Sequence, residues 1–376
     1  MNSENLQKII MLRHLLHTYP ELSMQEVHTR GVLMDFLRTH TGLEIHDRGR
    51  WFYARYAASD PNAPTIAFRA DMDALPIPEG ESVPSEHASR HPGISHKCGH
   101  DGHCAALAGF ALEVWRTRPR INVCFIFQHA EETGQGGAEC AEALSAMGCT
   151  AVYAFHNLSG YPENSIILRD GLSQCASRGL TFHFQGQASH ASQPEDGRSP
   201  AAAIARLVLY SQETPAPGIF ADMVLCTPVH ICMGDRDFGI SPGSGEVSFT
   251  IRANREADLD FLEDLLTKKA AGLAARSGLS MESSVTDPFP ETRNHSGPVR
   301  SILSAAERLG KQVIQMPEPW RASEDFGYYT KKCPGAIFYI GNGAHYAPLH
   351  TVPYDFNDGI LETAVDMYLE LLQEYL

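Results

Sequence analysis

The chain has 376 residues, of which 43% are apolar and 20% charged, and its formal net charge is −15 at pH 7. This length suits two or three domains, and the apolar content is that of a folded globular protein, so a disordered chain is excluded. The negative charge argues against nucleic acid or an anionic membrane surface as a partner, because both require basic patches.

Two further properties bear on the cellular compartment. No run of about 18 apolar residues can span a bilayer, and the polar N-terminus lacks the regions of a signal peptide. Nine cysteines stand at irregular spacing, several of them inside apolar runs, which is typical of free thiols rather than a disulfide framework. We therefore expect a cytoplasmic protein.

Helices and strands alternate in the first half of the chain. Apolar side chains recur at helical spacing over residues 3–18, and Ser23 to Glu26 matches a capping box that opens a second helix to about Leu37. Strands are predicted over 65–70, 122–127 and 151–155, and helices over 102–115 and 137–147. Short apolar strands separated by helices predict a mostly parallel sheet with helices on both faces.

The middle of the chain has a different order of elements. Strands are predicted over 180–185, 224–232, 246–252 and 281–285, and helices over 200–210 and 259–275. The resulting β-α-β-β-α-β order is that of a ferredoxin-like domain. Helix–strand alternation then returns, so we expect a catalytic domain formed by residues 1–177 and 289–376, interrupted by an inserted domain at 178–288.

Polar side chains follow three of the predicted strands directly. Asp71 and Asp73 follow the first strand, Glu131 and Glu132 the second, and His156 the third. Ligands of open α/β proteins bind at the edge where parallel strands end. We therefore expect these side chains to lie close together in one site.

A polar stretch between these strands holds a thiol and an imidazole two residues apart, Cys98 and His100. Both can bind metal from a single turn, and the adjacent Glu131 and Glu132 can serve as general base and ligand of a hydrolytic centre. Taken alone, the glutamates can be a solvated acidic loop, and a single histidine is more often an ordinary core residue. Together these residues favour a metal-dependent hydrolase.

Seven segments resemble the amidohydrolase/aminoacylase branch of the two-metal exopeptidases, the group of N-acyl-amino-acid, hippurate and indoleacetyl-amino-acid hydrolases. The segments, in family order, are HTYPEL (17–22), RADMDALP (69–76), CGHDGH (98–103), QHAEE (128–132), HAS (190–192), SEDF (323–326) and HTVPYD (350–355). The resemblance spans nearly the whole chain. It implies an α/β, phosphorylase/hydrolase-like zinc-exopeptidase domain with an inserted ferredoxin-like α+β lid and dimerisation domain.

The resemblance also implies roles for the matching residues. The ligands of a two-metal centre would be Cys98, His100, Glu132, His156 and His350. Cys98 stands where the wider superfamily often has a bridging carboxylate, and Glu131 matches the general base. His190, in the inserted domain, matches the group that stabilises the oxyanion, reaching the other subunit's site across a dimer. The residues expected to support the ligands without binding metal are Asp71, Asp73 and Asp101.

The resemblance implies two divalent metal ions, and the donor types suit transition metals (zinc, manganese, cobalt or nickel) better than magnesium. The resemblance implies a homodimer that hydrolyses a small N-acyl amino acid; a dipeptidase with the same machinery is the alternative. Two alternatives are a non-catalytic binding protein that keeps the fold, and a protein in which the Cys/His cluster binds a structural zinc ion. Glu131 and all five ligand positions are present, and the ligands span residues 98 to 350, which favours an active site.

Three positions depart from the family pattern. His129 stands where proline is usual, and the segment Phe238 to Pro242 lacks an asparagine associated with substrate contact across the dimer. Arg321 stands where methionine is common. It can be a surface charge or form a salt bridge with Glu324 or Asp325. The functional hypothesis is that it binds a substrate carboxylate, because a guanidinium group pairs bidentately with a carboxylate.

Overall fold

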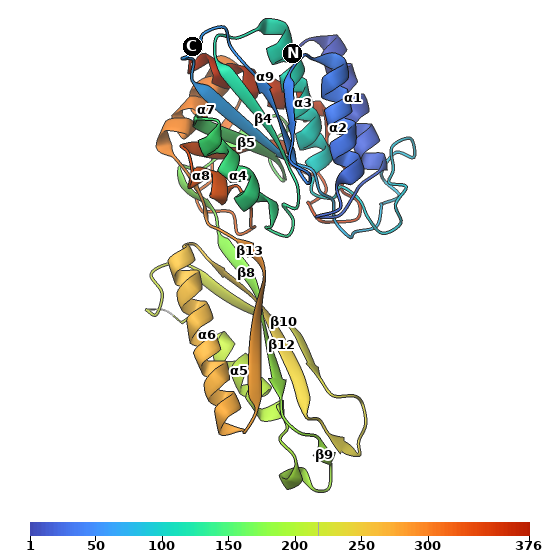
Figure 1. The fold of residues 1–376 in the computed structure, drawn as a ribbon, viewed down its shortest axis with the longest axis vertical. Coiled ribbons are helices and arrows are strands. Elements are labelled where there is room, and N and C mark those ends of the chain that lie inside the picture. Colours follow the sequence, from blue (N-terminus) through green and yellow to red (C-terminus); the bar gives the residue numbers. More distant parts are fainter. Residues whose placement is uncertain (217) are drawn as a thin grey trace. The chain divides into compact units, whose positions relative to one another are not determined.

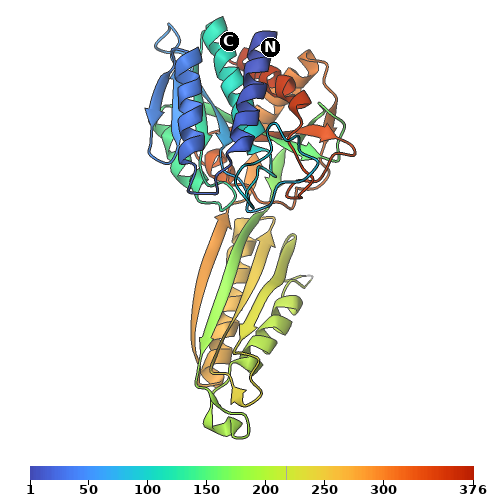
Figure 2. The same ribbon diagram turned by 90° about the vertical axis from the view of Figure 1, so that its right-hand side faces the viewer.

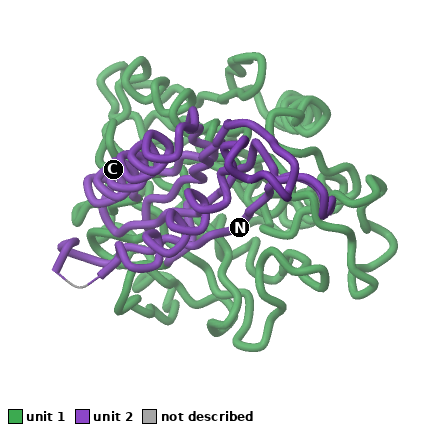
Figure 3. Tube along the Cα trace, turned by 90° about the horizontal axis from the view of Figure 1, so that it is seen from below, with its two compact units in different colours: residues 1–173, 292–320, 324–376 green, residues 174–291, 321–323 purple. Residues whose placement is uncertain are grey.

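The computed structural model describes residues 1–216 and 218–376. These residues form two compact units, shown in Figure 3. Unit 1 comprises Met1–Ser173, Thr292–Trp320 and Glu324–Leu376, and unit 2 comprises Gln174–Glu291 and Arg321–Ser323. The candidate metal ligands all belong to unit 1, whereas His190 and Arg321 belong to unit 2.

Unit 1 is built on an eight-stranded sheet with the order β1-β2-β4-β3-β5-β16-β6-β15. Its strands are β1 (Glu44–Asp47), β2 (Phe52–Tyr56), β3 (Thr65–Asp71), β4 (Asn122–Gln128), β5 (Cys149–Ser159), β6 (Ile166–Leu168), β15 (Val313–Gln315) and β16 (Gly335–Gly343). The central strands β4, β3, β5 and β16 are parallel, as predicted. Towards the two edges β2 pairs antiparallel with β4, and β6 with β16, so the complete sheet is mixed.

Helices cover both faces of this sheet (Figures 1 and 2). One face packs on α1 (Ser3–Thr18), α2 (Val27–His40), α3 (His100–Thr117), α7 (Ser296–Arg308) and α9 (Leu361–Gln373); the other packs on α4 (Gly136–Ala146) and α8 (Gly327–Thr330). Successive strand residues serve opposite faces: Phe68 and Phe125 belong to the first core, and Ala67 and Cys124 to the second. Burial on both sides explains why the central strands read as continuous apolar runs.

Unit 2 contains the four-stranded antiparallel sheet β10-β12-β8-β13. Its elements are β8 (Ala176–Gln185), α5 (Ala201–Glu213), β10 (Val224–Met233), β12 (Ser244–Ala253), α6 (Glu256–Arg276) and β13 (Ser280–Phe289). Both helices share a core with one face of the sheet, to which Phe182, Leu207 and Leu262 contribute. This is the ferredoxin-like arrangement predicted from the order of elements.

Short elements complete the described structure: β7 (Gly171–Gln174), β9 (Ser189–His190), β11 (Ile240–Ser241), β14 (Thr292–Asn294) and 3-10 turns at Pro194–Asp196 and Asp358–Ile360. All nine cysteines are free thiols, six of them buried, as the sequence predicted. Among the described residues, no helix is both long enough and apolar enough to cross a bilayer.

The predicted capping box at the start of α2 is wrong. Ser23 Oγ donates to Asp73 Oδ2 at 2.7 Å, and Glu26 Oε1 accepts from the Ala130 N–H at 2.7 Å. The helix begins at Val27, and its N-cap makes no side-chain hydrogen bond. Both side chains have partners in distant segments, which outweigh the local pairing that the motif describes.

The position assigned to His156 is also corrected. The strand predicted over 151–155 continues as β5 to Ser159, so His156 lies inside it rather than after its end. The strand extends because β16 continues to pair with it, with Tyr339 opposite His156. The side chain still contributes to the expected site, as described below.

Candidate metal centre

The turn before α3 supplies two donors. Between Cys98 and His100, Gly99 has a φ of 99°, a conformation that glycine adopts without strain. A Cβ at this position would lie 2.5 Å from Asn157 Oδ1, so a larger residue cannot be accommodated without displacing that side chain. The sequence Cys-Gly-His therefore allows a close approach to β5 that brings both donors to His156.

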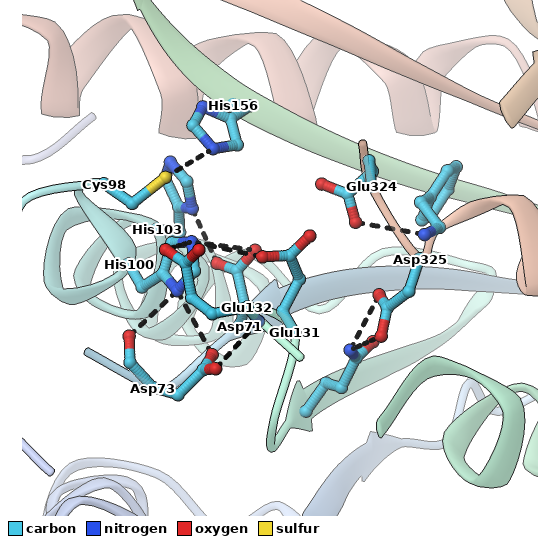
Figure 4. A network of polar contacts seen from close by, with 12 residues as sticks. Asp71, Asp73, Cys98, His100, His103, Glu131, Glu132, His156, Glu324 and Asp325 are labelled. Carbon is cyan, nitrogen blue, oxygen red and sulfur yellow. Dashed lines mark hydrogen bonds and ion pairs between the residues drawn. The ribbon is translucent and has the colours of Figure 1, made fainter. Parts of the chain in front are cut away.

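The five predicted ligands come together in unit 1. Cys98 Sγ lies 3.4 Å from His156 Nε2 and 3.2 Å from His350 Nε2. Glu132 Oε1 lies 3.7 Å from both His100 Nε2 and His350 Nε2. Two candidate ligand groups result, Cys98–His100–His156 and Cys98–Glu132–His350, and they share the thiol. Figure 4 shows four of these side chains converging beside Glu131.

Two observations indicate that these donors can bind cations: the orientation of two imidazole rings, and two buried atoms that lack a hydrogen-bond partner among the described residues. His100 Nδ1 donates to the Asp73 carbonyl at 2.9 Å, and His156 Nδ1 donates to the Asn157 carbonyl at 2.7 Å. A carbonyl oxygen only accepts, so Nδ1 of each ring carries a proton, and in the neutral ring Nε2 offers its lone pair to the site. His100 Nε2 and Glu132 Oε1 are buried without a hydrogen-bond partner among the described residues, which costs about 1–3 kcal/mol per group. Divalent cations would satisfy both atoms.

The electrostatics point the same way. Burial, reinforced by Glu132 and Glu131, raises the pKa of the Cys98 thiol well above its ordinary value. Burial, with neighbouring carboxylates, also raises the pKa of Glu131 well above its usual range and that of Glu132 to about 7. Burial alone would lower the pKa of His100, but carboxylates led by Asp71 outweigh it and raise it to about 10. Bound cations would stabilise the anionic forms of Cys98, Glu131 and Glu132 and so lower their pKa values.

The backbone is strained at two positions of the site. Ala130, directly before Glu131, has a φ of 48°, and the candidate ligand His350 has a φ of 60°. Such conformations cost about 1–3 kcal/mol and persist where the surroundings enforce them. The loop after Glu131 needs glycine, because a Cβ on Gly136 would lie 1.7 Å from the His129 carbonyl oxygen.

The unusual His129 contacts α4 and none of the donors in the hydrogen bonds and ion pairs described. Its Nε2 lies 3.6 Å from Glu139 Oε2, and its Nδ1 lies 3.9 Å from Cys140 Sγ. Burial lowers the pKa of the imidazole. The side chain that departs from the family pattern therefore faces α4 beside the loop.

Asp71 and Asp73 lie behind the donors. Asp71 Oδ1 lies 2.6 Å from His103 Nδ1. Asp73 holds the ring of His100 through its carbonyl and accepts from the Glu132 N–H at 2.9 Å through Oδ2. Asp73 thus contacts two of the proposed ligands, His100 and Glu132, whereas His103, to which Asp71 is hydrogen-bonded, is not among them. The supporting roles of both aspartates stay predictions.

Sequence reasoning included Arg69, Glu324 and Asp325 among the family markers but assigned Arg69 no role. The Arg69 guanidinium, 2% exposed, donates to Asp71 at 2.8 Å, to Glu324 at 2.9 Å and to Asp325 at 2.7 Å. Both acids considered as partners of Arg321 thus have a buried cation in unit 1. An arginine inside the apolar strand Thr65–Asp71 was the signal for such a site, because a buried charge requires partners.

The third aspartate, Asp101, belongs to a buried network. Its Oδ2 lies 2.7 Å from His17 Nδ1, and His17 Nε2 lies 3.0 Å from Glu79 Oε2. Glu79 also binds Lys97. Burial alone would lower the pKa of His17, but Asp101 and Glu79 outweigh it and raise the pKa to about 9.

This network predicts a pH-dependent stability of the metal-free protein. The His17 imidazolium stabilises the fold fully below its ordinary pKa of 6.5, and the contribution is lost as the pH rises through about 9. The loss should amount to about 3 kcal/mol in the free energy of unfolding. Denaturant unfolding of the wild type and of His17→Gln measures it: their difference should shrink by this amount on alkalinisation. A difference independent of pH would contradict the assignment.

The remaining predicted residues lie in unit 2. His190, on β9, is exposed, and its Nδ1 lies 2.7 Å from Ser192 Oγ. The carbonyl of Arg321 accepts from Arg252 at 3.0 Å. Phe238, in the segment that lacks the family asparagine, is 94% exposed. The roles of His190 and Arg321 stay predictions.

Comparison with known proteins assigns the family. The profile of peptidase family M20/M25/M40 matches residues 67–374. The chain belongs to this family. Among M20 relatives, N-acetylcysteine deacetylase of Bacillus subtilis (strain 168) is 28% identical over 378 residues, covering 97% of this chain and 96% of the relative. N-acetyldiaminopimelate deacetylase of Shouchella clausii (strain KSM-K16) is 28% identical over 380 residues, covering 99% and 98%.

A solved M20 structure is similar throughout. The Bacillus subtilis YXEP protein, a dinuclear metal binding peptidase, is 26% identical with a TM-score of 0.82, and the match covers 100% of both chains. The predicted family, α/β fold and enzyme class are therefore confirmed: the chain is a metal-dependent hydrolase of linear amides. Its donors suit two divalent ions, which argues against a single structural zinc.

Proposed function

We propose that this M20 member hydrolyses the amide bond of a small N-acyl amino acid with two divalent transition-metal ions. The pair of donor groups that share Cys98, next to Glu131, carries the proposal. The proposed ligands are Cys98, His100, Glu132, His156 and His350. The named activities of the two deacetylases support N-acyl amino acids over the dipeptide alternative.

The chain's own residues would divide the reaction as follows. Bound divalent ions would polarise the scissile carbonyl and make water a stronger nucleophile. Glu131 would take the proton from the attacking water and deliver it to the leaving amine. Its Oε2 lies 3.8 Å from His100 Nε2, so the carboxylate reaches the space that the donors enclose. His190 is assigned to the oxyanion, and Arg321 to the carboxylate of the substrate.

The unit around the ferredoxin-like sheet is assigned as a lid and dimerisation domain, with the boundaries 178–288. An exposed edge supports a homodimer: on β10, the outer strand of its sheet, Val229 is 59% and Ile231 is 54% exposed. Apolar edge strands are prone to pair with another chain. The free thiols suit a reducing compartment, in agreement with a cytoplasmic location.

The test is hydrolysis of N-acetyl amino acids and dipeptides by chelator-treated protein, before and after addition of Zn²⁺, Mn²⁺, Co²⁺ or Ni²⁺. We expect activity to disappear on metal removal, to return with at least one ion, and to be higher on the N-acetyl series. Hydrolysis that survives metal removal would contradict the mechanism. Higher activity on dipeptides would reverse the order of the two substrate classes.

A further inference from the structure

The turn between β4 and α4, which carries Glu131 and Glu132, is held by a distant side chain. Ala130 precedes Glu131 with its strained φ of 48°, and its N–H donates to Glu26 Oε1 at 2.7 Å. Glu26 is 4% exposed and lies 104 residues earlier in the chain. A buried carboxylate thus fixes the peptide group directly before the general base.

The loop that carries Glu26, directly before α2, reaches the turn a second time, on the other side of Glu131. Asp73 Oδ2 accepts from the Glu132 N–H at 2.9 Å and from Ser23 Oγ at 2.7 Å. The loop before α2 therefore contacts the catalytic turn twice, directly through Glu26 and indirectly through Ser23. The two contacts lie on either side of Glu131, whose carboxylate must point towards the donors to act as general base.

Capping of α2 does not explain the burial of Glu26. The N–H groups at the start of this helix are bound by Glu21, which accepts from His28 at 3.1 Å and from Thr29 at 2.8 Å. No ion pair is described between Glu26 and a basic residue, and burial with the nearby Asp73 raises its pKa to about 7. A buried carboxyl group is costly without a charged partner. Backbone groups of Glu26 itself and of Met24 also interact with this carboxyl, but the Ala130 amide is its partner in the turn that carries Glu131.

We propose that Glu26 is a positioning residue for the general base: by holding the Ala130 N–H, it keeps Ala130 in the left-handed conformation that directs Glu131 towards the donors. The inference rests on the proposed function, because it presupposes the role of Glu131. Glu26 touches neither the donors nor the space they enclose in the contacts described, so its effect is on geometry. The strain at Ala130 is the feature that this contact sustains.

The test compares three variants. Glu26→Ala removes the acceptor, and kcat should fall about 10- to 100-fold, because small misplacements of reacting groups have effects of this order. KM and metal content should stay near wild type. Glu26→Gln keeps an oxygen acceptor at the same place and should recover most of the rate. The matched control Glu21→Ala removes the cap of the same helix, so it should lower Tm and leave kcat unchanged.

Amide hydrogen exchange gives a readout independent of activity. In Glu26→Ala, peptides covering residues 129–135 should exchange faster, whereas Glu21→Ala should leave them as in the wild type. Equal loss of kcat in both alanine variants, loss of metal together with rate, or an inactive Glu26→Gln would overturn the proposal. If Glu26→Ala does not fold, Glu26→Asp withdraws the acceptor by one methylene, and wild-type kcat there would overturn it.

Failure of the proposed function has a different signature. Wild-type protein would then hydrolyse no amide of the panel, while exchange in the turn would still respond to Glu26→Ala. Faster exchange without any wild-type activity would therefore count against the function and leave the contact in place. Unchanged exchange with an active wild type would count against the contact alone.

Discussion

Replacing Glu131 by glutamine should lower kcat about 10²- to 10⁴-fold while KM and metal content stay close to wild type, because glutamine keeps the shape of the side chain but cannot accept a proton. Glu131 is 5% exposed, and its carboxylate lies beside His100 at the donors. No second residue in that position has been assigned to move a proton. The loss should therefore appear in kcat and kcat/KM alike.

The measurement is steady-state hydrolysis of the best N-acetyl amino acid by the metal-loaded protein, with metal content determined on the same sample. Glu142→Gln is a matched control, since Glu142 is an exposed residue of α4 that pairs with Lys332 at 2.7 Å. A rate for Glu131→Gln within about threefold of wild type, when general-base groups typically contribute at least 10², would remove Glu131 from the role.

Replacing Cys98 by alanine should have an effect of similar size for a different reason. Cys98 belongs to both donor groups, so its loss takes one ligand from each. We expect bound metal to fall from about two ions per chain to one or none under dialysis, as thiolate donors contribute strongly to transition-metal sites. Activity should fall by more than about 100-fold, because loss of groups that only support a ligand already lowers activity or affinity 10- to 100-fold.

Elemental analysis after dialysis, with activity on the same samples, tests this prediction. Cys333→Ala is the control, a buried thiol whose Sγ lies 3.4 Å from the carbonyl of Cys149, where β5 begins. Two ions retained by Cys98→Ala with wild-type activity would show that the thiol is not a ligand. Loss of metal in both cysteine variants would indicate general destabilisation.

The two predictions separate chemistry from metal binding. Glu131→Gln should keep the metals and lose the rate, whereas Cys98→Ala should lose both. If the metal were purely structural, Cys98→Ala would lose metal and stability, and Glu131→Gln would not change the rate. This contrast tests the role of Glu131 directly, because Glu131 and Glu132 lie at similar distances from the same atom, His100 Nε2, at 3.8 and 3.7 Å.

Much of the site followed from short-range pattern. Cys98 and His100 are two residues apart around a glycine whose φ of 99° permits the turn, and Glu131 and Glu132 follow a buried strand. These relations depend on neighbouring residues, which is why they can be read without a structure. The ends of elements were predicted less accurately. The strand expected over 151–155 is longer in the structure, because its pairing with β16 continues beyond that range.

Other features escaped sequence reasoning for a common reason. The residues Ser23 and Glu26 matched a helix cap, yet their partners are Asp73 and the Ala130 amide. Arg69 was a marker without a role until its contacts with three carboxylates were seen. A local motif states which bonds are possible, and the tertiary structure decides which are made.

The sequence by itself determined the alternation of helices and strands and the ferredoxin-like middle, because periodicity acts over a few positions. Its resemblance to known motifs identified the family and predicted the donor residues. Only the tertiary structure decided that Cys98 is shared by two donor groups and that Glu26 holds the catalytic turn. The contact from Cys98 to His350 joins residues 252 positions apart, and that from Glu26 to Ala130 joins residues 104 apart. Contacts of that length arise from the packing of whole elements, which no local pattern specifies.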